Sequence, residues 1–272
     1  MNEIKQNSPY AWFLAARPKT LTGAIIPVLL GSALTFSDGQ FKTAPALLCA
    51  LFACGMQIAA NFINDLFDFQ KGTDRREDRL GPQRACAEGW ITPAAMKTGI
   101  GIALTLSCLA GLAVLFTVWG QLPHGGWELV VLGVVCKLFA FLYTTLLSYR
   151  GWGDVLVLVF FGFVPVCGTY YVQAYTLNMD VVVLSLVSGL AIDTLLMVNN
   201  YRDREQDAVS GKCTLVVRYG KKFGENMYLA LGIAAVLLCF WFVYTGKLTP
   251  LEFIWAPCVY LYMHALTWRK MI

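Results

Sequence analysis

The sequence predicts an all-α protein, a polytopic bundle of transmembrane helices that forms one membrane-embedded domain over residues 1–272. Three observations lead to this prediction. Of the 272 residues, 57% are hydrophobic and only 14% are charged, whereas soluble domains average about 25% charged residues. The apolar residues fall into runs of roughly 20, the length that a helix needs to cross a bilayer. The basic residues gather in alternate links between these runs, as the positive-inside rule describes.

Eight apolar runs predict eight spans, whose links fall on alternate sides of the membrane. One side holds the N-terminus, the links 64–93, 148–152 and 200–223, and most of the 21 Lys and Arg residues, whereas the other side has only Lys42 and Lys247. The basic side is therefore predicted to be cytoplasmic. The predicted spans lie near residues 17–36, 43–63, 94–118, 127–147, 153–172, 179–199, 224–244 and 250–268.

Other classes of site find little support. The nine Cys residues are scattered without CxxC or Cys/His spacing, which predicts reduced packing residues. His124 and His264 lack partner spacing, so neither is predicted to be a ligand. There is no basic arm for nucleic acid, and the expected surroundings are a lipid bilayer. The sequence carries no signal for an oligomeric state.

A first Asp motif closes the second apolar run at residues 61–68. On a helix, Asn61, Asp65 and Asp68 are four and three residues apart and share one face. Two carboxylates and an amide at the end of an apolar helix are too costly to leave unpaired, so a cation is expected there. Further polar and basic side chains in and after the motif are Asn64, Lys71, Arg75, Arg79 and Arg84.

A second Asp motif, residues 199–207, closes another apolar run with the same spacing. Asn199 and Asp203 repeat the separation of Asn61 and Asp65, and Asp207 follows four residues later. A single such cluster is usually a solvated helix boundary, but a matched pair argues against that interpretation. Four helices separate the motifs, so the chain is predicted to consist of two parallel halves with both motifs on the cytoplasmic side. Basic residues Lys212 and Arg218 follow this motif as well.

This arrangement suits a metal–diphosphate complex. Mg²⁺ takes oxygen ligands and is commonly held by one or two carboxylates together with substrate phosphates. The apolar bundle would hold a hydrophobic tail, so the predicted substrate is a lipid diphosphate whose leaving group the metal stabilises. The predicted metal ligands are Asn61, Asp65, Asp68, Asp203 and Asp207. The predicted diphosphate-binding set adds Asn64, Lys71, Arg75, Arg79, Arg84, Tyr149, Arg150, Asn199, Asn200, Lys212 and Arg218.

These motifs resemble the UbiA superfamily of intramembrane prenyltransferases. The first motif and its continuation, Lys71-Gly72-Thr73-Asp74 and Asp78-Arg79-Leu80-Gly81-Pro82, are similar to that superfamily's first motif. More narrowly, the chain resembles the 1,4-dihydroxy-2-naphthoate polyprenyltransferases of menaquinone synthesis. The stretches that carry this likeness begin at Ala16-Arg17-Pro18, Tyr149-Arg150-Gly151, Gly168-Thr169-Tyr170, Asn199-Asn200-Tyr201, Gly211-Lys212 and Thr214-Leu215-Val216.

The resemblance implies a reaction and a location. A polyprenyl group would pass from an allylic polyprenyl diphosphate to 1,4-dihydroxy-2-naphthoate with loss of the carboxylate, giving demethylmenaquinone through Mg²⁺-assisted ionisation to a carbocation. The protein would lie in a bacterial cytoplasmic membrane with its site facing the cytoplasm. Two features depart from the superfamily. Gly72 stands where many members have another Asp, and eight spans are expected where nine are usual, so this is either a short member or a chain whose ninth helix lies outside the given sequence.

Several polar residues have two interpretations. Asp193, inside the sixth span, is a candidate catalytic residue, as a base or a partner to ring hydroxyls. Alternatively it is an internal acid bonded to Ser, Thr or Lys. Lys137 would snorkel or pair with Asp193. Asp154 would bond to substrate or cap a helix, and Arg17 would meet lipid phosphates or the helix entry, or else contact the substrate anion.

Three alternative functions remain open at this stage. Another aromatic acceptor, such as 4-hydroxybenzoate or homogentisate, would use the same motifs. A secondary transporter also has repeated halves and intramembrane charges, although its site would lie near the bilayer midplane rather than at the cytoplasmic edge. A lipid-diphosphate phosphatase or phosphotransferase would release phosphate, or move a phosphate-bearing group, rather than leave inorganic diphosphate.

Overall fold

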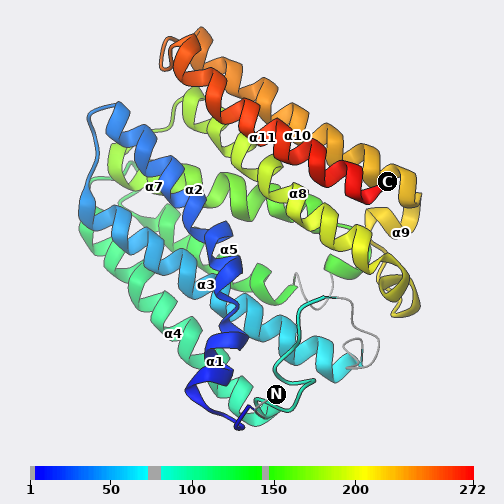
Figure 1. Ribbon diagram of the computed structural model, residues 1–272. Helices are drawn as coiled ribbons and strands as arrows, with labels where there is room; N and C mark the ends of the chain where they lie inside the picture. Colours follow the sequence, from blue (N-terminus) through cyan, green and yellow to red (C-terminus); the bar gives the residue numbers. More distant parts are fainter. Residues whose placement is uncertain (1–3, 73–80, 143–146) are drawn as a thin grey trace. The chain divides into compact units, whose positions relative to one another are not determined.

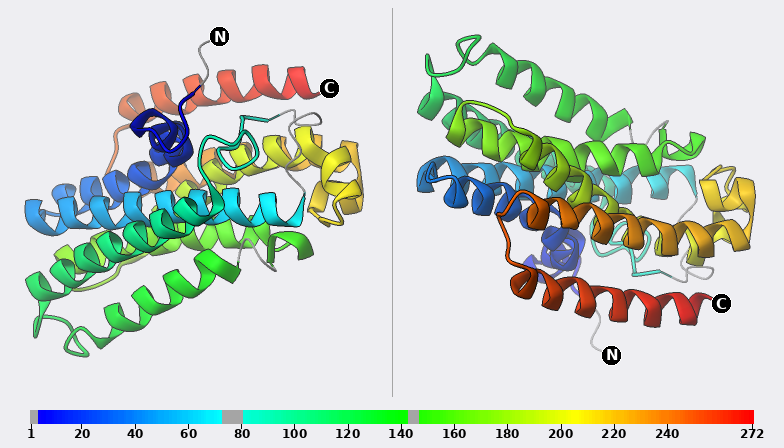
Figure 2. Two further views of the ribbon diagram at one scale, coloured as in Figure 1. Left: turned by 90° about the horizontal axis from the view of Figure 1, so that it is seen from below. Right: turned by 90° about the horizontal axis from the view of Figure 1, so that it is seen from above.

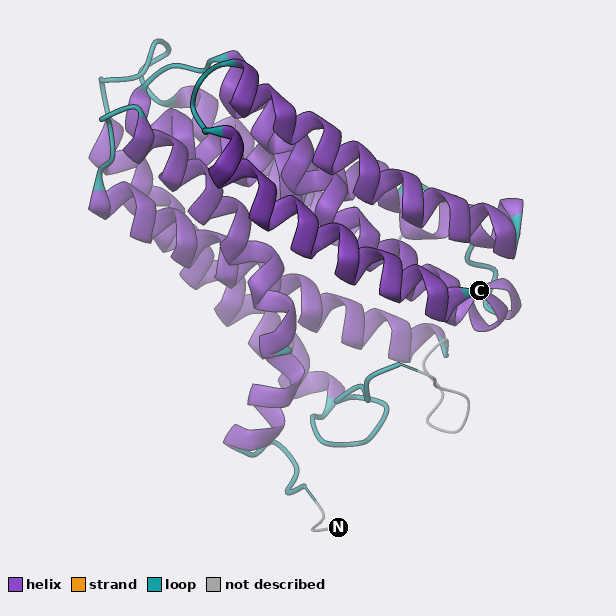
Figure 3. Ribbon diagram, turned by 45° about the horizontal axis from the view of Figure 1, so that its top comes forward, coloured by secondary structure: helices purple, strands orange, loops and turns teal. Residues whose placement is uncertain are grey.

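The computed structural model describes residues 4–72, 81–142 and 147–272, and every regular element in these ranges is a helix (Figure 3). The predicted all-α class is confirmed. The elements are α1 (Pro9–Ala16), α2 (Pro18–Ser37), α3 (Thr43–Lys71), α4 (Pro93–Val118), α5 (Trp127–Leu142), η2 (Ser148–Arg150), α6 (Gly153–Val157), the π-helix η3 (Leu158–Phe163), α7 (Val164–Ala174), α8 (Met179–Val209), α9 (Leu215–Tyr219), α10 (Lys221–Tyr244) and α11 (Pro250–Met271).

Each of the eight predicted spans coincides with a helical segment. Six segments of the described chain are long and apolar enough to cross a membrane: α2, α3, α4, Gly153–Ala174, α8 and α10. The described part of α5 has 16 residues, and α11 is not among the six. One side of α4 exposes Ile102, Leu106, Leu109 and Phe116, as a lipid-facing surface does. The chain is an integral membrane protein, and the count of eight spans stays a prediction.

Side-chain caps explain where several helices begin. Four start directly after a Thr or Asn whose side-chain oxygen accepts a backbone N–H of the first turn, a bond that satisfies one of the helix's unpaired donors. At α8 the Asn178 oxygen accepts the N–H of Val181 at 3.0 Å. The other three caps are Thr92 before α4, Thr214 before α9 and Thr249 before α11.

Helices α3 and α8 both continue beyond their apolar runs. The predicted membrane spans end near residues 63 and 199, and the helices themselves continue to Lys71 in α3 and Val209 in α8. The reason is that each keeps an apolar face past the polar motif, through Leu66 on α3 and Tyr201 on α8, which pack into a core. Both Asp motifs therefore lie on helices, as their spacing requires.

The chain divides into two compact units. Unit 1 comprises Met1–Ile26 and Thr43–Tyr149, and unit 2 comprises Pro27–Lys42 and Arg150–Ile272. In unit 1, α3 packs along α4, and α5 packs against both (Figure 1). Its core contains Phe62, Ile63 and Met96. The first Asp motif belongs to this unit.

Unit 2 is built around α8, which packs against η3 on one side and α10 on another. Helix α10 also lies alongside α11, as the views of Figures 1 and 2 agree. The contact with η3 is close, because a Cβ on Gly162 would lie 2.5 Å from the carbonyl oxygen of Ser185. The second Asp motif belongs to this unit.

A polar network joins several helix ends of unit 2. Tyr170 donates a hydrogen bond to Asp38 at 2.7 Å, and Lys247 pairs with Asp38 and lies 3.4 Å from Asp180. Burial alone would raise the pKa of Asp38, but hydrogen bonds from Lys247 and Tyr170 lower it from its ordinary value. The bond to Asp38 likewise raises the pKa of Lys247. This end of the unit, which carries no Asp motif, is held by ionic contacts.

Candidate functional site

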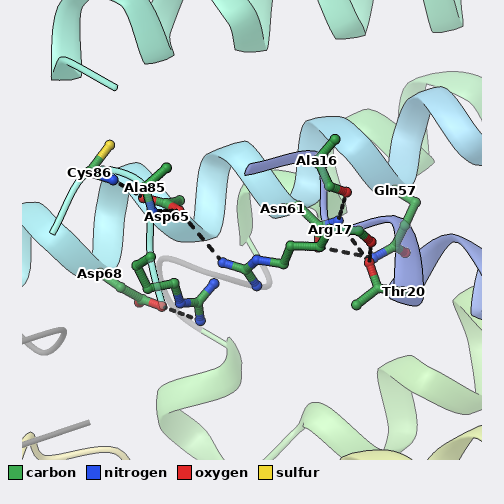
Figure 4. Close-up of polar contacts among 10 residues, drawn as sticks. Ala16, Arg17, Thr20, Gln57, Asn61, Asp65, Asp68, Ala85 and Cys86 are labelled. Atoms are coloured by element: carbon green, nitrogen blue, oxygen red, sulfur yellow. Dashed lines mark hydrogen bonds and ion pairs between the residues drawn. The ribbon is translucent and has the colours of Figure 1, made fainter. Parts of the chain in front are cut away.

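Asp65 is the most enclosed polar residue of the first Asp motif. Its side chain is 1% exposed, and its two carboxylate oxygens accept the backbone N–H groups of Ala85 and Cys86 at 2.9 and 2.8 Å. A guanidinium nitrogen of Arg17 lies 3.8 Å from one of these oxygens. Figure 4 shows these groups converging from α3, the α1–α2 junction and the segment that precedes α4. Asp65 therefore holds the returning chain against α3.

Asn61 anchors the junction between α1 and α2. Its amide nitrogen donates to the carbonyl of Ala16 and to the hydroxyl of Thr20, both at 2.9 Å (Figure 4). Its oxygen accepts a hydrogen bond from Gln57 at 3.2 Å. Arg17, at this junction, has a left-handed backbone with φ of 51°, a conformation that costs free energy in a residue other than glycine. Asn61 thus stabilises the strained turn that brings Arg17 to Asp65.

Asp68 is more accessible than Asp65. Its side chain is 23% exposed, and a guanidinium nitrogen of Arg84 lies 3.5 Å from a carboxylate oxygen. The Lys71 ammonium lies 3.8 Å from the centre of the Tyr149 ring. Arg84, a member of the predicted diphosphate-binding set, thus lies beside the motif. Lys71 stacks on Tyr149, and both also belong to that set. Asn64 is partly buried, and Arg75 and Arg79 lie outside the described residues.

The second Asp motif also meets cations of its own unit. Arg202 forms a bidentate pair with Asp203 at 2.6 and 2.7 Å. The Lys212 ammonium lies 3.4 Å from a carboxylate oxygen of Asp207, so this predicted acid and predicted base are in contact. The remaining predicted members differ in exposure: Asn200 is buried, whereas Asn199, Arg150 and Arg218 are exposed.

Oxygen ligands for Mg²⁺ are present in both motifs. Carboxylate and amide oxygens suit this ion, and the partly exposed Asp68 and Asp203 each already neighbour a guanidinium, so each accommodates positive charge. Each Asp65 oxygen accepts one N–H and keeps a second lone pair. Within residues 4–72, 81–142 and 147–272, no three His, Cys, Asp or Glu side chains gather closely enough to hold a metal. The donor set fits Mg²⁺ shared with substrate phosphates, and joint use of both motifs stays a prediction.

Asp193 and Asp154 are deeply buried acids of unit 2, at 1% and 6% exposure. Each has a buried Oδ1 without a hydrogen-bond partner among the described residues. Lys137, on α5 of unit 1, contacts the Cys108 thiol on α4, and its pairing with Asp193 of unit 2 stays a prediction. Asp193 is not bonded to Ser or Thr in the part of the chain described.

Two contacts in the motifs were missed by the sequence analysis. Arg17 was expected at lipid phosphates, the helix entry or the substrate anion, but it lies beside Asp65. Arg202 was not singled out, although it pairs with its neighbour Asp203. The available signal for Arg17 was its position immediately before Pro18, which disfavours continuation of a right-handed helix.

Comparison with known proteins identifies a matching family and similar relatives. The family model described as "UbiA prenyltransferase family" matches residues 24–271. A protein of Escherichia coli (strain K12) named 1,4-dihydroxy-2-naphthoate octaprenyltransferase is 37% identical over 242 residues, covering 88% of this chain and 78% of the relative. A protein of the same name from Haemophilus influenzae is 36% identical over 234 residues, covering 84% and 75% respectively.

A solved structure has the same fold. It is described as a UbiA homolog from Archaeoglobus fulgidus bound to DMAPP and Mg²⁺, and it superposes with a TM-score of 0.66 at 14% identity. The match covers 95% of this chain and 86% of that one. At this identity the likeness concerns the fold alone.

Proposed function

The chain belongs to the UbiA prenyltransferase family, and we propose that it transfers a polyprenyl group to 1,4-dihydroxy-2-naphthoate. The bond between the prenyl C1 and the diphosphate oxygen breaks, and C1 bonds to a carbon of the naphthalene ring. The ring loses its carboxylate as carbon dioxide, which gives the quinol form of demethylmenaquinone. The observation that carries this proposal is the 37% identity over 242 residues to a relative of that name. The alternative of solute transport has no comparable support.

We assign diphosphate binding to the two Asp motifs. Their carboxylates, Asp65 and Asp68 on α3 and Asp203 and Asp207 on α8, would hold Mg²⁺, with Asn61 supporting the first pair. Bound Mg²⁺ would stabilise the charge that develops on the departing diphosphate. The basic side chains beside the acids, Arg84, Arg202 and Lys212, would donate charge-assisted hydrogen bonds to phosphate oxygens. A solved fold relative described with Mg²⁺ and DMAPP supports this chemistry.

The site is proposed to face the cytoplasm of a bacterial cell. The predicted links that contain the two motifs, residues 64–93 and 200–223, carry 11 of the 21 Lys and Arg residues, which favours the cytoplasmic side of the membrane. The polyprenyl tail would then enter from the bilayer and lie among the apolar helices. The surroundings of the reacting carbon would be dry and aromatic-rich, which protects a carbocation from water.

A direct assay tests the proposal. The purified protein in detergent receives octaprenyl diphosphate, 1,4-dihydroxy-2-naphthoate and Mg²⁺, and products are followed by mass. We expect a product heavier than the acceptor by the prenyl group and lighter by carbon dioxide, and none after chelation of the metal. Prenylation of 4-hydroxybenzoate or homogentisate alone would overturn the assignment of the acceptor, and absence of any transfer would overturn the function.

Variants on one helix link the activity to the second Asp motif. Replacing Asp203 by Asn (Asp203→Asn) removes the carboxylate that pairs with Arg202, and we expect turnover to fall by at least about 100-fold. The control is Glu205→Gln, since the Glu205 side chain is 83% exposed and contacts only Arg204 among the described residues. Its turnover should be unchanged. Equal activity in both variants would contradict the assigned role of Asp203.

A further inference from the structure

Two buried acids of unit 2 are not explained by diphosphate binding. Asp154 lies at the start of α6 and Asp193 in the middle of α8, and both side chains are more than nine-tenths buried. Helix α6 packs directly against α8: a Cβ on Gly153, next to Asp154, would lie 3.3 Å from the Leu196 side chain, which is three residues from Asp193 on α8. Neither acid forms an ion pair with any described residue. Buried carboxyl groups are normally paired or hydrogen-bonded, so a bound group with hydrogen-bond donors would satisfy these two acids.

Asp193 shares a helix face with the second Asp motif. Positions 193, 200 and 207 are seven residues apart, which is close to two helical turns, so the three side chains project from one face of α8. Asp193, Asn200 and Asp207 are all buried. Each step of seven residues spans about 10 Å. Three buried polar side chains therefore lie along this face, from Asp207, where Lys212 provides a cation, to Asp193 about 20 Å deeper in the span.

The chemistry of the two acids selects the ligand. Each of Asp154 and Asp193 has a buried Oδ1 that makes no hydrogen bond within the described ranges. Two neighbouring carboxyl groups in a dry site are stabilised by O–H donors, because ionised carboxylates only accept hydrogen bonds. No third His, Cys, Asp or Glu of the described chain joins them, which disfavours a metal ion. A neutral group with hydroxyl donors fits best.

We propose that Asp154 and Asp193 form a subsite that accepts hydrogen bonds from the ring hydroxyls of the aromatic acceptor. This proposal rests on the proposed function, because it names where that function's second substrate binds. Placing the acceptor's carboxylate in this dry site would cost free energy, so the hydroxyl edge of the ring faces Asp193 and the carboxylate points away from it. Along α8, the diphosphate would then lie toward Asp207 and the aromatic ring deeper in the membrane.

Equilibrium binding of acceptor analogues tests the subsite. The probes are 1,4-dihydroxy-2-naphthoate and its dimethyl ether, which keeps the ring and carboxylate but donates no ring hydroxyl. The unsubstituted protein should bind the diol at least about 10-fold more tightly than the ether, because a site built for hydroxyl groups leaves its acceptors unpaired with the ether. In Asp193→Ala and in Asp154→Ala, this preference should fall to within about 2-fold. Asp193→Asn, which retains one acceptor oxygen, should keep part of it.

A matched variant and a kinetic readout separate this role from loss of packing. Ser188, also buried on α8, donates to the carbonyl of Phe161 on η3 at 2.8 Å. Ser188→Ala thus loosens the same helix contact, yet it should leave the preference for the diol intact. In steady-state assays Asp193→Ala should raise the KM for the acceptor at least about 10-fold and leave the KM for polyprenyl diphosphate within about 2-fold.

The possible outcomes distinguish failure of the subsite proposal from failure of the proposed function. A preference for the diol that survives in both alanine variants, or a loss confined to polyprenyl diphosphate, overturns the subsite even if prenyl transfer is confirmed. If the unsubstituted protein binds 4-hydroxybenzoate and not the naphthoate, the acceptor assignment fails, and the same variants are scored on that phenol and its methyl ether. Failure to bind any aromatic acceptor overturns both proposals.

Discussion

Asp65 shows how one side chain can serve both the fold and the chemistry. Its carboxylate accepts two backbone N–H groups from residues that follow it by 20 and 21 positions. These charge-assisted bonds are among the stronger ones in proteins, and they lie in a region where water cannot replace them. Asp68, one turn further along α3, is 23% exposed, and a guanidinium nitrogen of Arg84 lies 3.5 Å from its carboxylate. The two acids of the first Asp motif should therefore respond differently to the same substitution.

We predict that Asp65→Asn is destabilising and Asp68→Asn is not. An amide at position 65 has a single oxygen, which can accept the N–H of Ala85 or that of Cys86. Its NH₂ group would then face the remaining backbone N–H, so that two donors oppose each other. The loss should be about 1–3 kcal/mol, whereas the partly exposed pair of Asp68 contributes less than about 1 kcal/mol. Thermal unfolding in detergent compares them directly. Equal melting temperatures would show that Asp65 does not hold the segment preceding α4.

At the scale of the helix, sequence and structure agree on which residues share a face, because residue spacing alone determines this. The separation of Asn61, Asp65 and Asp68 predicted one helical face, and α3 carries all three. Spacing did not indicate which groups form hydrogen bonds with these residues. The partners of Asp65 are backbone N–H groups of a segment 20 residues further along the chain, and the course of that segment depends on tertiary packing. For the same reason the contact of Arg17 with Asp65 was not predicted. The predicted spans end near residues 63 and 199, where the apolar runs end, and helices α3 and α8 continue through the polar motifs to Lys71 and Val209.

The contact between η3 and α8 depends on glycine. A Cβ at Gly162 would lie 2.5 Å from the Ser185 carbonyl oxygen and 3.1 Å from the Cα of Gly189. These are backbone atoms, which cannot rotate away, so the two helices would have to separate. This contact lies beside the face of α8 that carries Asp193, so the separation would also disturb the proposed acceptor subsite.

We therefore predict that Gly162→Ala destabilises the protein by about 1–3 kcal/mol. The control is Gly168→Ala on α7 of the same unit, where nothing lies within 4 Å of the added Cβ. There the alanine should be neutral or stabilising by up to about 1 kcal/mol, since glycine is a poor helix former. Unfolding temperatures of the two variants provide the comparison. A stable Gly162→Ala protein would contradict the close packing of η3 on α8.

At the scale of the whole molecule, the two units share one continuous helix. The division falls between Ile26 and Pro27, inside α2. The first half of α2 belongs with Asn61, through Thr20, and its second half with Gln173, through Thr35. A helix that forms contacts in both units links their stabilities. We propose on this ground that residues 1–272 fold as the single domain expected from the sequence.

The orientation of the whole chain in the membrane is our last prediction, and a native cysteine reports it. Cys213 is exposed in the link between α8 and α9, on the side where basic residues gather and which the positive-inside rule places in the cytoplasm. A membrane-impermeant thiol reagent should therefore label Cys213 in inverted vesicles and not in intact spheroplasts, with Cys213→Ser showing the background. Thr245→Cys, in the link between α10 and α11, should give the opposite pattern. If Cys213 were labelled from outside, both Asp motif helices would end on the external face. The protein would then require its diphosphate substrate outside the cell, which would overturn the proposed cytoplasmic site while leaving the chemistry of the motifs intact.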